Sequence, residues 1–121
     1  IDRLVCECKE MGIHLVIMTG GEPFLRKDLF DLFEKHEDTL FQIYTNGTLV
    51  NKKMVDRFVT LGNVVLAISL EGLREETDAR RGKGHFDRIV RVMRSLKEAG
   101  LFFAVSTTQT SKNISPTQTN R

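Results

Sequence analysis

The chain has 121 residues, of which 40% are hydrophobic and 28% are charged, and its formal net charge is +2. This composition is typical of one folded domain with a modest core, and the small charge argues against nucleic acid or an anionic membrane as the principal partner. No apolar run approaches the roughly 20 residues that span a bilayer. The two cysteines, Cys6 and Cys8, are too close for an ordinary disulfide, so we expect a cytoplasmic protein.

The first segment carries an apolar stripe at helical spacing. The stripe consists of Ile1, Leu4, Val5, Cys8 and Met11. Because it starts at the first position and no start methionine precedes it, we expect a chain that begins inside a helix and is a fragment of a longer parent protein. On this helix Cys8 is expected in the core and Cys6 toward solvent.

Four segments rich in β-branched and aromatic residues predict strands, with amphipathic helices between them. The strands are expected at residues 14–18, 41–44, 64–70 and 102–105. Helices are expected from Arg26 onward, after an N-cap at Asn51, and over residues 86–96. Gly12, Gly62 and Gly100 each follow a helix, where a left-handed C-terminal cap favours glycine.

This alternation predicts an α/β fold of parallel βα units. A complete (β/α)₈ barrel takes about 250 residues, so the chain would form about half of such a barrel, or else a small open sheet. We expect this domain over residues 1–110 and a polar, disordered tail over residues 111–121. Terminal strands without neighbours would leave exposed sheet edges, which favours self-association.

Polar residues gather where the predicted strands end. They are Gly20, Gly21, Glu22 and Pro23 after the first strand, Thr45 and Asn46 after the second, Ser69 and Glu71 after the third, and residues 106–108 after the fourth. Ligands of parallel sheets bind beyond the carboxyl ends of the strands, so this rim could satisfy an amine, a ribose and a polar base edge. Each residue taken singly is also an ordinary turn former or helix cap. Their coincidence on one rim favours a binding site.

At this point the sequence resembles a known family. Gly20-Gly21-Glu22-Pro23 is similar to the GGEP motif of radical S-adenosylmethionine (radical SAM) enzymes, and it directly follows a strand as it does in that family. The resemblance continues through "YTNGTLV", "LAISLEG" and "RRGKGHFDRIVRVMRSLKEAG", and covers about residues 1–110. It implies a partial TIM barrel and S-adenosylmethionine as a small-molecule cofactor.

The GGEP resemblance implies that Gly20, Gly21 and Glu22 hold the amino group of the methionine moiety, with Pro23 shaping the turn. A carboxylate and backbone carbonyls are the acceptors that an ammonium group needs.

The resemblance assigns further contacts along the same rim. It implies that Ser69 and Glu71 contact the ribose, and that Arg81 pairs with the methionine carboxylate. Arg80 is adjacent to Arg81, so the choice between the two arginines stays open. The other implied positions are Thr45 and Asn46, which line the mouth of the site, and Thr107, which flanks the adenine.

The sequence departs from the family at the cluster motif. The family binds a [4Fe–4S] cluster through CxxxCxxC upstream of the GGEP segment, and Cys6 and Cys8 do not match that motif. Two residues apart on a helix, their side chains point about 200° from each other and cannot share a metal. We therefore expect no metal ligand and no catalytic residue in this chain, cluster ligands elsewhere in the parent enzyme, and a fragment that is inactive on its own.

Three other features have simpler interpretations. The stretch Arg80-Arg81-Gly82-Lys83-Gly84 lacks the Walker A pattern, and we expect a mobile basic loop there. The three histidines, His14, His36 and His85, are expected in surface or capping roles. A rival function also remains open, that of a non-catalytic α/β module that binds a nucleotide or a protein, with the glycine pair serving only a tight turn. The substrate of a parent enzyme is not predicted.

Overall fold

The computed structural model describes residues 1–108 and contains one sheet of four parallel strands in the order β1-β2-β3-β4. The strands are β1 (Leu15–Met18), β2 (Leu40–Thr45), β3 (Val64–Ser69) and β4 (Phe103–Ser106). The helices are α1 (Asp2–Glu10), the 3₁₀ turn η1 (Pro23–Leu25), α2 (Leu29–Lys35), α3 (Lys52–Leu61), α4 (Arg74–Arg81) and α5 (His85–Glu98). The predicted α/β fold of parallel βα units is confirmed. The predicted tail, residues 111–121, lies outside the described residues.

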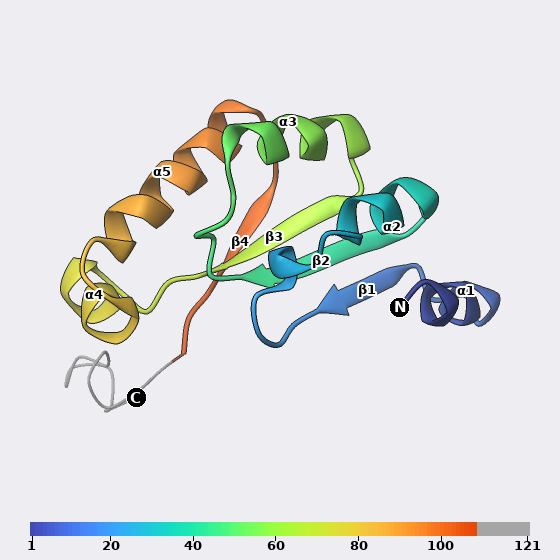
Figure 1. Cartoon of the computed structure of the whole chain (residues 1–121), viewed down its shortest axis with the longest axis horizontal. Coiled ribbons are helices and arrows are strands. Elements are labelled where there is room, and N and C mark those ends of the chain that lie inside the picture. Colours follow the sequence, from blue (N-terminus) through green and yellow to red (C-terminus); the bar gives the residue numbers. More distant parts are fainter. Residues whose placement is uncertain (109–121) are drawn as a thin grey trace, which may run out of the picture.

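The core lies between the sheet and the helices α2, α3 and α5, which cover one of its faces (Figure 1). Alternate residues of β2 point into this core, so Phe41 and Ile43 are fully buried. Both belong to the core cluster, in which the ring centroid of Phe33 of α2 lies 4.9 Å from that of Phe41. Burial of each such side chain contributes roughly 1.5–3 kcal/mol, so this layer fixes the strand register and the position of the strand ends.

Helix α3 begins and ends where its sequence signals predict. The Asn51 side chain accepts a hydrogen bond from the backbone N–H of Met54 at 3.1 Å, and Gly62 ends the helix with a left-handed φ of 68°. Gly12 and Gly100 also have positive φ, as expected for residues that follow helices. The predicted strand boundaries differ from the observed ones by at most one residue.

Helix α4 was not predicted from the sequence. The expected basic loop is wrong for Arg80 and Arg81, because both lie in the last turn of this helix, and only Gly82-Lys83-Gly84 form the link to α5. Of the residues of α4, only Thr77 is buried. A helix that is polar on nearly every side has no apolar period, and periodicity is the main helix signal in a sequence.

The chain after Pro23 also differs from the prediction. Pro23 starts the short turn η1, and Arg26 is extended with a ψ of 126°. Helix α2 therefore begins at Leu29 rather than at Arg26. Proline is well suited to the first position of such a turn because it has no N–H to satisfy and its φ is already set.

The apolar stripe of α1 is largely open to solvent. Val5 is buried, whereas Leu4 is 59% and Met11 is 68% exposed. Cys6 is exposed as predicted, but Cys8 is half-buried rather than in the core. Within the part of the chain that the structure describes, no helix has the length and apolar character that a membrane crossing requires.

His36 caps the end of α2 and is only 3% exposed, so the surface role expected as one possibility is wrong and the capping role is confirmed. Its Nε2 lies 2.8 Å from an Asp2 carboxylate oxygen, and Lys35 donates to the other oxygen of the same carboxylate at 2.8 Å. These contacts fasten α1 to α2. The pKa of Asp2 lies below its ordinary value because of the hydrogen bonds from Lys35 and His36.

Candidate functional site

The turn after β1 is built on two glycines with left-handed backbone conformations. Gly20 has a φ of 94° and Gly21 a φ of 41°, a region that other residues rarely adopt. A Cβ atom at either position would meet nothing within 4 Å. The glycines are therefore required by the backbone conformation rather than by crowding, and they leave open space beside the main chain at the end of β1.

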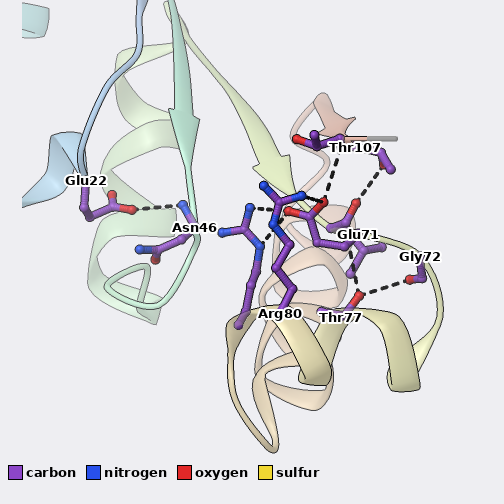
Figure 2. A network of polar contacts seen from close by, with 10 residues as sticks. Glu22, Asn46, Glu71, Gly72, Thr77, Arg80 and Thr107 are labelled. Carbon is purple, nitrogen blue, oxygen red and sulfur yellow. Dashed lines mark hydrogen bonds and ion pairs between the residues drawn. The ribbon is translucent and has the colours of Figure 1, made fainter. Parts of the chain in front are cut away.

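Glu22 follows these glycines and fastens the turn to the neighbouring strand. Its Oε1 accepts hydrogen bonds from the Thr45 hydroxyl at 2.8 Å and from the Phe24 N–H at 3.3 Å, and its Oε2 accepts from the Asn46 N–H at 2.9 Å. Figure 2 shows this carboxylate pointing at Asn46. Glu22 is thus the N-cap of η1 and, at the same time, a bridge to the end of β2.

The loop after β2 is held by its own polar side chains. Thr45 is 1% exposed, and its hydroxyl accepts from the Gly47 N–H at 2.9 Å. Asn46 accepts at its side-chain oxygen from the Thr48 N–H at 2.8 Å and from the Thr48 hydroxyl at 2.6 Å. Gly47 has a φ of 73°, and a Cβ atom there would lie 2.7 Å from Cδ1 of Ile89. The sequence "TNG" is therefore needed both for the loop conformation and for its close packing on α5.

A second cluster is centred on Glu71, just beyond the end of β3. This carboxylate is 2% exposed and accepts from Arg81 Nε at 3.0 Å, from Arg81 Nη2, from Arg80 Nη1 at 3.1 Å and from the Thr108 N–H at 3.3 Å. Burial would raise the pKa of Glu71, but the Arg81 hydrogen bond and charge, with contributions from Thr108 and Arg80, bring it below its ordinary value. Glu71 is therefore ionised at neutral pH.

Threonine side chains brace the loops around Glu71. Thr77 is fully buried, donates from its hydroxyl to the Gly72 carbonyl at 3.2 Å and accepts from the Glu71 N–H at 3.3 Å. Thr107 donates to the Leu70 carbonyl at 2.7 Å, which joins the end of β4 to that of β3. Thr77 was missed by the sequence analysis, although it is a short polar residue in a segment of longer charged ones.

The structure thus places every predicted site residue at the carboxyl end of the sheet or on the helix that follows. It brings Glu22, Thr45 and Asn46 into direct contact, and Glu71 and Arg81 into another. Ser69 is half-buried on β3 and lies opposite Ser106 of β4 in the strand register. Arg80, left open by the sequence, joins Arg81 on the same carboxylate.

One group of possible metal ligands lies far from this rim among the described residues. Asp2, Cys6 and His36 have ligand atoms within 4.8 Å of one another. The ammonium group of Lys35 already occupies one Asp2 oxygen, at 2.8 Å, and would repel a divalent cation.

Comparison with protein families matches residues 1–110 to the model described as the radical SAM superfamily. The chain belongs to the radical SAM superfamily. Its four-stranded sheet is accordingly part of a radical SAM barrel. The chain shares 32% identity with the Fe-coproporphyrin III synthase of Methanosarcina barkeri over 114 residues, which is 92% of this chain and 29% of that protein. It shares 32% identity with the mycofactocin maturase MftC of Mycolicibacterium smegmatis over 117 residues, 92% of this chain and 29% of the relative.

Solved structures confirm the radical SAM fold. The Streptococcus suis protein SuiB, solved bound to S-adenosylmethionine, superimposes with a TM-score of 0.78 at 22% identity, over 93% of this chain and 27% of SuiB. The protein anSMEcpe, solved with bound AdoMet, gives a TM-score of 0.61 at 22% identity, over 75% of this chain and 28% of that one. The chain therefore spans under a third of the length of each of these four proteins.

Proposed function

We propose that this chain forms part of the S-adenosylmethionine site of a radical SAM enzyme. Three observations support the proposal. The chain belongs to a family that uses this cofactor, the polar residues of the GGEP and neighbouring segments lie at the carboxyl end of the sheet, and SuiB, which shares the fold, has been solved with S-adenosylmethionine bound. We assign to the whole protein the family's activity, the reductive cleavage of S-adenosylmethionine to a 5′-deoxyadenosyl radical that abstracts hydrogen from a substrate.

The observation that carries the proposal is the hydrogen-bonding capacity of Glu22. A carboxylate has about four acceptor positions, and three are used by Thr45, Phe24 and Asn46. One position remains for the ammonium group of the methionine moiety. The carboxylate is half-buried and already fixed, so it would bind the ammonium without first losing side-chain freedom. Gly20 and Gly21, with open space beside their backbone, would let the ligand approach the main chain.

The remaining contacts follow the same rim. We assign Ser69 to a ribose hydroxyl, Arg81 to the methionine carboxylate and Thr107 to the edge of the adenine. Thr45 and Asn46 shape the mouth through their bonds to Glu22. The ribose contact implied for Glu71 would require its carboxylate to give up bonds to Arg80, Arg81 and Thr108, which enclose it.

The cysteines of this chain do not fit a [4Fe–4S] cluster. Such clusters are held by several thiolates, whereas Cys6 and Cys8 are the only cysteines and lie two residues apart on α1. We propose that the ligands lie outside these 121 residues and that the chain alone does not cleave S-adenosylmethionine. Incubation with dithionite and S-adenosylmethionine should give no 5′-deoxyadenosine above background, and its formation would contradict this proposal.

Isothermal titration calorimetry with S-adenosylmethionine tests the binding proposal. We expect saturable binding by the 121-residue chain, and about fivefold weaker binding by Ser69→Ala, since one hydrogen bond contributes roughly 1 kcal/mol. Ser95→Ala on α5, also half-buried but away from the rim, is the control and should bind as the wild type does. A folded wild-type chain that does not bind would contradict the proposal and favour the rival function of a non-catalytic module.

A further inference from the structure

The Glu71 carboxylate is already hydrogen-bonded within the protein, unlike a group that is free to bind a ligand. From the residues that the structure describes, this carboxylate accepts four hydrogen bonds, two from Arg81, one from Arg80 and one from the Thr108 N–H. Four bonds fill the acceptor positions of a carboxylate. The side chain is 2% exposed, so a ribose could reach it only after these contacts were broken. Glu22, in contrast, keeps an acceptor position.

The bonds of Glu71 join three elements of the rim. Glu71 itself follows β3, both arginines come from the last turn of α4, and Thr108 follows β4. Figure 2 shows the side chain of Arg80 reaching the Glu71 carboxylate, and Arg81 donates to the same carboxylate. Thr77 adds a brace, because its hydroxyl contacts the Glu71 N–H and the Gly72 carbonyl. The start of α4 is thereby fixed relative to β3, and Glu71 fixes its end.

The arginines keep the capacity to bind an anion while they contact Glu71. The side chain of Arg80 is 46% exposed and that of Arg81 is 24% exposed, whereas Glu71 is buried beneath them. Two guanidinium groups and one carboxylate leave a net charge of +1 in the cluster. Each guanidinium has five N–H donors in a planar fork, and the bonds to Glu71 use two from Arg81 and one from Arg80. A planar carboxylate is the ligand that such a fork fits best.

We propose that Glu71 is a positioning residue that holds Arg80 and Arg81 as a paired binding site for the carboxylate of the methionine moiety, and that it does not contact the ribose. This inference rests on the proposed function and deepens it. An arginine side chain has many rotamers, and fixing them on a buried carboxylate reduces the entropy lost when the ligand binds. The positioning role of Glu71 also explains why two arginines stand next to each other in the sequence, because both reach one carboxylate from the last turn of α4.

A pair of ligands distinguishes positioning of the arginines from contact with the ribose. S-adenosylmethionine and its decarboxylated analogue share the adenosine and the ammonium group, and only the first has the carboxylate. We expect the wild-type chain to bind S-adenosylmethionine about 10-fold more tightly than the analogue, as for a charge-assisted hydrogen bond. Glu71→Gln should reduce this preference to about twofold while it changes the affinity for the analogue by less than about threefold. An equal loss of affinity for both ligands, with the preference retained, would overturn the proposal and support a ribose contact.

The control is Arg74→Gln. Arg74 lies on α4, as Arg80 and Arg81 do, but it pairs with Asp87 of α5 and not with Glu71. This variant should leave the preference unchanged. Because Glu71 is buried, Glu71→Gln could fail to fold, and Arg81→Gln then provides the second variant, which should likewise reduce the preference to about twofold. In the double variant of Glu71 and Arg81, no further loss should occur if Glu71 acts through Arg81.

A measurement without ligand separates this inference from the proposed function. In ¹H–¹⁵N spectra of the wild-type chain, the Nε–H of Arg81 should exchange slowly with water because it donates to the buried Glu71 carboxylate at 3.0 Å. In Glu71→Gln the exchange should become at least about 10-fold faster, as a weakened hydrogen bond at a partly exposed group requires. Unchanged exchange would refute the positioning role even if the chain binds S-adenosylmethionine. Failure of the wild-type chain to bind, with slow Arg81 exchange retained, would refute the proposed function and the carboxylate site that rests on it, but not the positioning of Arg81 by Glu71.

Discussion

Replacement of Glu22 by glutamine should destabilise the folded chain in the absence of any ligand. The carboxylate accepts three hydrogen bonds, whereas the amide has only one accepting oxygen. If that oxygen takes the position of Oε1, the bonds from Thr45 and Phe24 are kept, and the Asn46 N–H then faces the amide nitrogen, which cannot accept. Glutamine therefore loses at least one charge-assisted bond and leaves a half-buried N–H without a partner.

The magnitude follows from that count. Loss of one bond to a charged group costs about 1.5–3 kcal/mol of unfolding free energy. With a urea m-value of about 1–3 kcal/mol per M for a domain of this size, the unfolding midpoint of Glu22→Gln should fall by on the order of 1 M. Equilibrium urea unfolding followed by circular dichroism measures it. The slope should not change, because the same surface is exposed on unfolding.

Glu34→Gln is the matched control for this prediction. Glu34 forms an ion pair with Arg57 at 2.5 Å, but both side chains are about half exposed, so its loss should cost less than about 1 kcal/mol. A midpoint of Glu22→Gln no lower than that of Glu34→Gln would refute the reasoning. The unfolding measurement is also needed to interpret cofactor binding by Glu22→Gln. Weaker binding by this variant shows a lost contact only if the fraction of folded chain is known.

Three further perturbations test other parts of the structure. Gly47→Ala should lose about 2–4 kcal/mol of unfolding free energy in urea, because the strain of a left-handed alanine is added to the clash of its Cβ at 2.7 Å from Ile89. Gly62→Ala is the control: its Cβ would meet no atom within 4 Å, so it should lose only about 1–2 kcal/mol. Equal losses would mean that Ile89 moves aside freely. Asn63→Ala should lose about 2–4 kcal/mol in thermal unfolding, since its buried amide donates to three backbone carbonyls, and a loss under 1 kcal/mol would show that water replaces it. Because the pKa of Glu71 is lowered in the folded chain, its ionised form stabilises the fold fully above its ordinary pKa, and this stabilisation is lost as the pH falls through the folded-state pKa. The free energy of unfolding in urea should therefore change less between pH 7 and pH 3 in Glu71→Gln than in the wild type.

Local sequence signals predicted most of the fold, because each acts over a few residues. The apolar runs around Ile43 and Leu66 became neighbouring strands, and the cap at Asn51 fixed the start of α3. Helix α4 was missed because its contacts are polar ones with the segment that precedes it rather than those of an apolar face of its own. Thr77 and Arg81 make those contacts, with Gly72 and Glu71 respectively.

In the candidate site, too, some features follow from the sequence and others only from the tertiary structure. The sequence alone determined which residues lie at the strand ends, since alternation of strands and helices brings every strand end to one edge of a parallel sheet. It also determined the glycine positions, because only glycine adopts left-handed φ without strain. The tertiary structure alone decided which of these polar groups bond to one another. Glu22 and Glu71 both follow strands, yet Glu22 keeps an acceptor position at the rim, whereas Glu71 is enclosed by two arginines of α4. Burial and hydrogen-bond saturation depend on elements far apart in the chain, and those distances are set only when the helices pack on the sheet.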